Sequence, residues 1–309
     1  MQLTASTAPH VHHRDRTATL MLDVITALVP SAAAGIWLFG WNAARVILLS
    51  TVFCVLLEMI WQKLTKKPIR INDFSAAVTG IILALNLPPT APWWMILIGA
   101  AVAIVLVKQM FGGIGCNFVN PALAARAVLL TSWPTLMAAS NTSSAYVTPF
   151  DGVTSATLLT PGNGLNVSMI DMLLGRIPGT IGEVCKVAIL IGFVYLLIRR
   201  TITWHIPVVM LASFAAFSAI FGQNPVTALL TGGIMFGAVF MATDYVTSPM
   251  THAGQAIYAA GAGLIVALIR SFGGYPEGVT YGILLMNLAT PLIDRAIRPR
   301  IYGEVKAHE

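Results

Sequence analysis

One short stretch of the sequence places several hydroxyl groups beside an acid. It reads Asp151-Gly-Val-Thr-Ser-Ala-Thr157. A threonine hydroxyl carries no electrons itself, but it can be esterified to the phosphate of FMN and so hold a redox-active ring at a fixed place. The small neighbours Ser155 and Ala156 leave room for a separate transferase to reach Thr157, and Asp151 can help that enzyme recognise the hydroxyl. The alternative is a polar loop in which serine and threonine occur by chance.

A second stretch combines glycines, amides and a cation. It reads Phe111-Gly-Gly-Ile-Gly-Cys-Asn117-Phe-Val-Asn120-Pro-Ala-Leu-Ala-Ala-Arg126. Its glycines permit close approach of the backbone, and the amides of Asn117 and Asn120 can hydrogen-bond a flavin ring or a quinone-like head group. Equally, Asn can cap a helix with Pro at its first turn, and Arg126 can reach the membrane interface. Both interpretations stay open. Without a strand, a turn and a helix in succession, these glycines form no dinucleotide-binding motif.

A third stretch, Met241-Ala-Thr-Asp244-Tyr-Val-Thr-Ser-Pro-Met-Thr251, places an acid at the end of an apolar segment. An acid beside a membrane span suggests a cation pathway, although Asp244 and its neighbouring hydroxyls can equally cap helices. The remaining acids near predicted span ends, Asp23, Glu58 and Asp294, are expected where water reaches them.

The sequence predicts no metal or iron–sulfur site and no catalytic residue of its own. Cys54, Cys116 and Cys185 lie far apart, with no paired spacing and no nearby histidine, so we expect ordinary apolar positions. The cluster of His10, His12 and His13 is expected to be a solvated part of the N-terminal tail.

The composition requires a membrane around these residues. Of 309 residues, 57% are hydrophobic and 10% charged, and the mean hydropathy is +0.79. Soluble domains carry about 25% charged residues, so a soluble enzyme, a disordered chain and a secreted disulfide scaffold are excluded. The net charge of +6 lies in short basic runs between apolar stretches, which is typical of a membrane protein and not of a nucleic-acid-binding surface.

The fold class predicted is an all-α integral membrane protein with about ten transmembrane helices. The N-terminal 19 residues show no pattern of a cleaved signal peptide, so the first span is expected to be retained. Backbone that breaks inside the membrane, as at Asn86–Thr90, must be buried in protein or face a cavity. The apolar segments are residues 20–39, 44–61, 74–88, 92–110, 119–133, 182–198, 205–221, 226–243, 254–270 and 279–297.

The distribution of Lys and Arg predicts the orientation. With the N-terminus in the cytoplasm, 13 basic residues fall on the inner side and five fall outside or within spans, so both termini are expected inside. The long connection 134–181 then lies on the outer face. The predicted parts are a tail 1–19, a membrane half 20–133, the outer loop 134–181, a second half 182–298 and a tail 299–309.

Weak internal symmetry suggests that the two halves are repeats. Gly80–Thr90 resembles Gly237–Thr251, since each is the end of an apolar helix followed by a polar break with proline, and a Phe-Gly-Gly follows the next span in each half. Five spans per half would place the two copies upside down relative to each other. Inverted repeats hold their binding sites near the midplane, between broken helices.

These motifs, in their order, resemble the D subunits of Rnf complexes, ion-pumping oxidoreductases that link ferredoxin and NAD. The B subunit of the Na⁺-pumping NADH:quinone reductase shares the flavin-threonine motif but usually has a longer N-terminal region, so the Rnf subunit is the better match. The resemblance rests on Arg16 to Asp23, Val29-Pro30, Leu38 to Trp41, Asn72 to Ser75, Leu87 to Trp94, Phe111 to Gly115, Asn120-Pro121-Ala122, Asp151 to Thr157 and Ala242 to Pro249.

The resemblance implies a function that composition alone does not. In this family the motif threonine, here Thr157, carries covalent FMN that a dedicated flavin transferase attaches on the outer side. A second, non-covalent flavin, riboflavin, is implied by the quinone-reductase relative, with Asn117 and Asn120 as candidate contacts. The implied fold has two inverted five-helix halves and is similar to urea transporters, so a solute channel is the competing class.

The resemblance also implies a location and partners. The chain is expected in the cell inner membrane, with membrane lipid around it, and to act only within its complex, beside the FMN-bearing G subunit and the membrane A and E subunits. Whether Na⁺ or H⁺ crosses the membrane stays open.

Overall fold

The computed structural model describes residues 16–138, 169–175, 179–273 and 278–297, and this part of the chain is helical and holds no strand. Two of its elements, η2 and η3, have the wider turns of a π-helix. The elements in order are α1 (Thr17–Phe39), α2 (Trp41–Leu64), η1 (Ile71–Asp73), α3 (Ser75–Leu85), α4 (Trp93–Ala101), η2 (Val102–Gln109), α5 (Pro121–Ser132), α6 (Pro134–Ala138), α8 (Met169–Leu174), α9 (Lys186–Ile198), α10 (His205–Ile220), α11 (Pro225–Leu230), α12 (Ile234–Phe236), η3 (Gly237–Met241), α13 (His252–Phe272) and α14 (Val279–Ala296).

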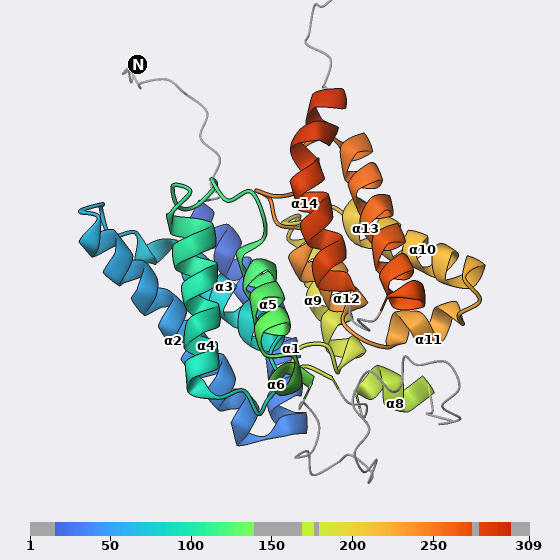
Figure 1. The fold of residues 1–309 in the computed structure, drawn as a ribbon, viewed down its shortest axis with the longest axis horizontal. Coiled ribbons are helices and arrows are strands. Elements are labelled where there is room, and N and C mark those ends of the chain that lie inside the picture. The colour runs from blue at the N-terminus through green and yellow to red at the C-terminus, as the bar shows by residue number, and fades with distance from the viewer. Residues whose placement is uncertain (1–15, 139–168, 176–178, 274–277, 298–309) are drawn as a thin grey trace, which may run out of the picture.

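The helices gather in two groups. In Figure 1 the elements from α1 to α5, blue to green, lie on one side, and those from α9 to α14, yellow to red, lie on the other. Within the groups α2 packs on α3 and α10 packs on α13, while α1 packs on α9 between the groups. One apolar core joins both groups, since buried residues of α1, α3, α5, η3 and α13 belong to the same cluster.

Small residues allow the closest of these contacts. A Cβ on Gly80 of α3 would come within 2.7 Å of the Cα of Thr51 in α2. The hydroxyl of Ser50 donates to the Gly80 carbonyl at 2.8 Å, so the two helices also share a buried hydrogen bond. Any side chain at position 80 would push α3 away from α2.

The outer surface of the described helices is apolar, as a membrane requires. Trp37, Trp41, Leu48, Ile198 and Leu292 are each 66% or more exposed. Three helices, α1, α2 and α13, are long and apolar enough to cross a membrane, and shorter apolar helices accompany them. The described part of the chain is therefore helical throughout its regular structure and has the apolar surface of a membrane protein.

Helices occupy each of the predicted apolar segments, and the structure adds where they are interrupted. The segment predicted at 226–243 is divided into α11, α12 and η3, with a turn at Thr231–Gly233. The segment predicted at 74–88 is helical only to Leu85 and then continues as irregular backbone. Both breaks lie in the interior, where the sequence predicted that broken backbone must be buried.

Candidate functional site

The structure reaches only part of the sequence-predicted site. Asp151, Ser155, Ala156 and Thr157 lie outside the described residues, as does most of the predicted outer loop. Asn117 and Asn120 are described, and both are buried, with 7% and 4% of their surface exposed.

Asn120 fixes the start of α5. Its Oδ1 accepts from the backbone N–H groups of Ala122 and Leu123 at 3.0 and 3.3 Å, and Pro121 occupies the first helical turn. Its Nδ2 donates to the carbonyl of Met241, the last residue of η3, at 3.1 Å. This geometry is the helix cap that the sequence offered as one alternative. Asn120 therefore joins the two halves of the chain through its own side chain.

Asn117 joins the same two regions from the irregular segment before α5. Its Nδ2 donates to the Val119 carbonyl at 3.1 Å, and its side chain also hydrogen-bonds Asp244, in the irregular segment that follows η3. Burial raises the pKa of the Asp244 carboxyl, and the hydrogen bonds from Val246, Thr247 and Asn117 oppose this effect without cancelling it. The second and third stretches singled out in the sequence thus form one site.

A cavity of about 110 Å³ lies between these two segments. Its walls are mostly apolar and include Val78 and Ile82 of α3 together with Val239 and Phe240 of η3. A few polar groups face it as well, which is the usual composition of a small-molecule site. The polar residues that line it are Ser75, Thr79, Lys108, Asn117, Asn120, Thr243, Asp244 and Tyr245.

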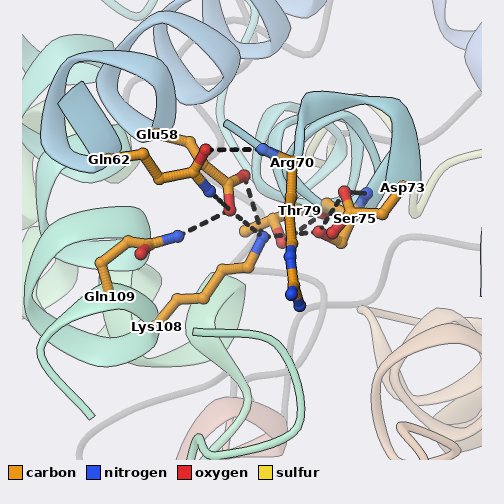
Figure 2. A network of polar contacts seen from close by, with 8 residues as sticks. All are labelled: Glu58, Gln62, Arg70, Asp73, Ser75, Thr79, Lys108 and Gln109. Carbon is orange, nitrogen blue, oxygen red and sulfur yellow. Dashed lines mark hydrogen bonds and ion pairs between the residues drawn. The ribbon is translucent and has the colours of Figure 1, made fainter. Parts of the chain in front are cut away.

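One residue that lines this cavity, Lys108, belongs to a buried ion pair. Figure 2 shows Glu58 of α2 and Lys108 of η2 pointing toward each other, with Gln109 beside them. Lys108 Nζ lies 2.9 Å from Glu58 Oε1 and donates to the Ser75 hydroxyl at 2.6 Å, while Gln109 Nε2 donates to Glu58 Oε1 at 2.6 Å. The π-helical turn of η2 places Lys108 and Gln109 side by side on this acid.

On its other side the ion pair borders a second cavity. Glu58, Gln62 and Gln109 line this space of about 240 Å³ together with Arg70 and Asp73. Since Lys108 lines the first cavity and Glu58 the second, the pair separates the two. The expectation that Glu58 lies where water reaches it is wrong, because its side chain is 2% exposed and paired.

A family model matches most of the chain. The model described as the NQR2, RnfD, RnfE family matches residues 4–303. The chain belongs to this family.

Curated relatives in this family match over nearly their full length. The chain is 49% identical over 99% of its length to the D subunit of a Na(+)-translocating ferredoxin:NAD(+) oxidoreductase complex from Acetobacterium woodii, of which 97% is covered. It is 41% identical to the D subunit of the proton-translocating ferredoxin:NAD(+) oxidoreductase complex of Clostridium ljungdahlii, with 97% of this chain and 96% of the relative covered. It is 37% identical to the D subunit of the ion-translocating oxidoreductase complex of Escherichia coli, with 97% and 98% covered. The resemblance found in the sequence motifs is confirmed.

This family member carries a second polar network that the sequence did not predict. Arg126 of α5 is 1% exposed and donates to Glu183 Oε1 at 2.9 Å and to Asn86 Oδ1 at 2.5 Å. The alternative that Arg126 reaches the membrane interface is therefore wrong. One signal was present, since Glu183 and Lys186 stand three residues apart at the start of an apolar segment, where charges are costly unless paired.

The burial of the cysteines agrees in part with what the sequence predicted. Cys54 is buried and Cys185 partly buried, but Cys116 is exposed, which corrects the expectation of an apolar position there.

The structure places Asp23 in an ion pair with Arg199 at 3.2 Å, which links α1 to the end of α9. No group of three His, Cys, Asp or Glu residues able to hold a metal occurs among the described residues.

Proposed function

We propose that this chain is the D subunit of an Rnf complex and works as its membrane flavoprotein, with activity only inside the complex. The observation that carries this proposal is the full-length match to relatives named as D subunits of ferredoxin:NAD(+) oxidoreductase complexes. One relative is named as part of a Na⁺-translocating complex and another as part of a proton-translocating complex, so the names of the relatives leave the transported ion open.

Thr157 is the proposed attachment point of FMN. The motif Asp151-Gly-Val-Thr-Ser-Ala-Thr157 supports this role, together with the resemblance to the family. When bound, FMN supplies the one-electron and two-electron chemistry that no side chain of this chain offers. Thr157 contributes the hydroxyl that forms the phosphoester, Ser155 and Ala156 keep it accessible, and Asp151 marks it for the transferase.

The cavity beside Asn117 is the proposed site of a second, non-covalent flavin such as riboflavin. The lining residues suit the ring of such a molecule, since Val78, Ile82 and Phe240 offer apolar surface for a flat ring and polar groups stand at the edge. A whole flavin is larger than the 110 Å³ of this cavity, so its binding requires the lining side chains to move apart. Asn117 and Asp244 are the side chains proposed to meet the polar edge of the ring. Asn120 acts differently, because its amide is committed to the cap of α5 and to Met241, and so it shapes the wall.

The proposed arrangement in the membrane has ten spans in two inverted halves, with both termini in the cytoplasm and the loop 134–181 outside. Helices at every predicted segment support the count. The ends of α3 and η3 support the inversion, because Asn86, the C-cap of α3, donates to the sulfur of Met241 at the end of η3. We propose the G subunit and the membrane A and E subunits as neighbours in the complex.

One experiment separates this proposal from a solute channel. The purified chain is denatured, run on a gel and examined for fluorescence, and the peptide that spans residues 151–160 is weighed by mass spectrometry. We expect flavin fluorescence on the protein band and an FMN-sized addition on Thr157 that disappears in Thr157→Ala. An unmodified wild-type peptide, or an addition on Thr154 or Thr160, would contradict the assignment.

A further inference from the structure

Three buried cations converge on the broken helices at the centre of the chain. Arg126 of α5 and Lys186 of α9 are each 1% exposed, and Arg270 of α13 is 8% exposed. They come from both helix groups, and they all reach the backbone breaks that follow α3 and α11. We call these three residues the cation cluster.

Two members of the cluster hold the end of α11. Arg270 Nη1 donates to the carbonyl oxygens of Ala228 and Thr231 at 2.9 and 3.3 Å. Lys186 Nζ donates to the carbonyl of Gly232 at 2.8 Å and to that of Glu183 at 2.5 Å. Four carbonyl oxygens at and beside this break therefore accept from side-chain cations.

The third member holds the end of α3. Asn86 is the C-cap of this helix, and its Nδ2 donates to the Ile82 carbonyl at 2.7 Å. Arg126 binds the Oδ1 of Asn86 and the carboxylate of Glu183. Glu183 in turn lies against the α11 break, since a Cβ on Gly233 would come within 2.7 Å of its carboxyl carbon. The two breaks and the three cations thus form one continuous cluster.

The oxygens in this cluster are of the type that binds metal cations elsewhere. The C-terminal end of a helix carries partial negative charge and carbonyl oxygens without intrahelical partners. In transporters with broken helices such ends coordinate Na⁺ near the middle of the membrane. The 11 residues of α3 span roughly 16 Å, about half of a ~30 Å hydrocarbon layer, so its end lies at a comparable depth.

We propose that Arg126, Lys186 and Arg270 are tethered cations that occupy a latent cation site between the ends of α3 and α11 and close the centre of this chain to free ions and solutes. The chain's own guanidinium and ammonium groups take the place that Na⁺ takes in a transporter of similar design. Because they are covalently attached, they satisfy the carbonyl oxygens and the Glu183 carboxylate but cannot move across the membrane.

A centre closed by the cation cluster prevents ions from leaking through this chain. An open centre would let ions run back down the gradient that a pump builds, so a tight centre suits a component of an ion-translocating complex. The coupling ion then follows a route outside this cluster. The inference rests on the hydrogen bonds of the cluster and holds whether or not a flavin occupies the cavity at Asn117.

The test measures passive permeability of the intact complex in lipid vesicles, without ferredoxin or NAD. Uptake of radioactive Na⁺ and of urea is followed for the wild type, for Lys186→Gln and for the neutral pair Arg126→Gln/Glu183→Gln. The control, Asp23→Asn/Arg199→Gln, neutralises an ion pair between α1 and the end of α9 that lies outside the cluster and lines neither cavity. We expect tight vesicles for the wild type and the control, and uptake of Na⁺ or urea about tenfold faster in the two cluster variants, because a mobile solute can then enter the vacated site.

Two results would overturn the proposal: wild-type complex that passes Na⁺ or urea, or assembled cluster variants as tight as the control. Where the cluster variants do not assemble, Arg126→Gly is purified with and without guanidinium. Assembly restored by guanidinium but not by NaCl supports a cation site at this position. A variant that stays unassembled with every added cation counts against the proposal, because the arginine would then supply more than its charge.

Discussion

Lys108 Nζ lies 2.9 Å from Glu58 Oε1, and the two side chains are 5% and 2% exposed. Lys108 lies in the π-helical η2 and Glu58 in α2, and the pair separates the candidate flavin cavity from a second cavity. It is the second of two buried acid–base pairs in the described residues, beside Arg126 and Glu183. One member of each pair lies outside regular α-helix, since Lys108 belongs to the π-helical η2 and Glu183 to the turn before α9.

We predict that Lys108→Met destabilises the chain more than Glu58→Gln/Lys108→Gln does. The single variant leaves an unpaired carboxylate in a buried site, which costs about 3–5 kcal/mol, while the double variant leaves two neutral amides that can hydrogen-bond each other. The thermal unfolding midpoints of the two variants are compared on the purified complex, with size-exclusion chromatography of heated samples as the readout. Equal midpoints for the single and double variants would show that the pair is not held as charges.

We predict that Asn120→Ala lowers the unfolding midpoint and loosens the non-covalent flavin. The change removes a helix cap and the link to Met241, for a loss of about 1–3 kcal/mol. Asn120→Ser keeps a neutral oxygen that can cap α5 and loses the amide donor to Met241, so its midpoint should fall between those of the wild type and Asn120→Ala. Flavin released by acid is measured on the same samples. Wild-type stability in Asn120→Ala would contradict the proposed role in shaping the cavity.

We predict that Asp244→Asn removes part of the pH dependence of stability. Burial raises the pKa of the Asp244 carboxyl in the folded state above its unfolded value. The unfolded chain therefore loses this proton first as pH rises, and the folded state loses stability from the unfolded pKa up to the folded pKa. Above that window Asp244→Asn should unfold at a higher temperature than the wild type, and well below it the two should agree. The opposite order at neutral pH would mean that the carboxylate is stabilised by a partner.

We predict that a cysteine at position 141 and Cys116 react from opposite sides of the membrane. Asn141→Cys lies in the loop proposed to be outside, whereas Cys116 is exposed in the stretch that follows η2, which the proposed topology places on the inner side. In a Cys116→Ser background an impermeant thiol reagent should label Asn141→Cys in intact cells. With Asn141 unchanged, Cys116 should react only in inverted vesicles. Labelling in the reverse order would invert the topology and the side on which FMN is attached.

The sequence by itself determined the class of protein, the family and the places of the helices. Apolar residues in runs of 15 to 20 leave a helix in lipid as the only way to satisfy the backbone, so the segments were readable without any contact. The Asn-Pro pair at 120 and 121 likewise signalled a helix start, because capping depends on residues only two or three positions apart.

Only the tertiary structure decided which charged groups meet. Glu58 and Lys108 are 50 residues apart and Arg126 and Glu183 are 57 residues apart, so no local pattern could pair them. The depth of Arg126 stayed open in the sequence for the same reason, since a long cation near a span can reach water or a buried partner equally well. The partner exists because the irregular segment before α9 brings Glu183 to α5. Only tertiary packing thus brings the charged residues of this apolar sequence together as buried ion pairs and encloses the cavity beside Asn117.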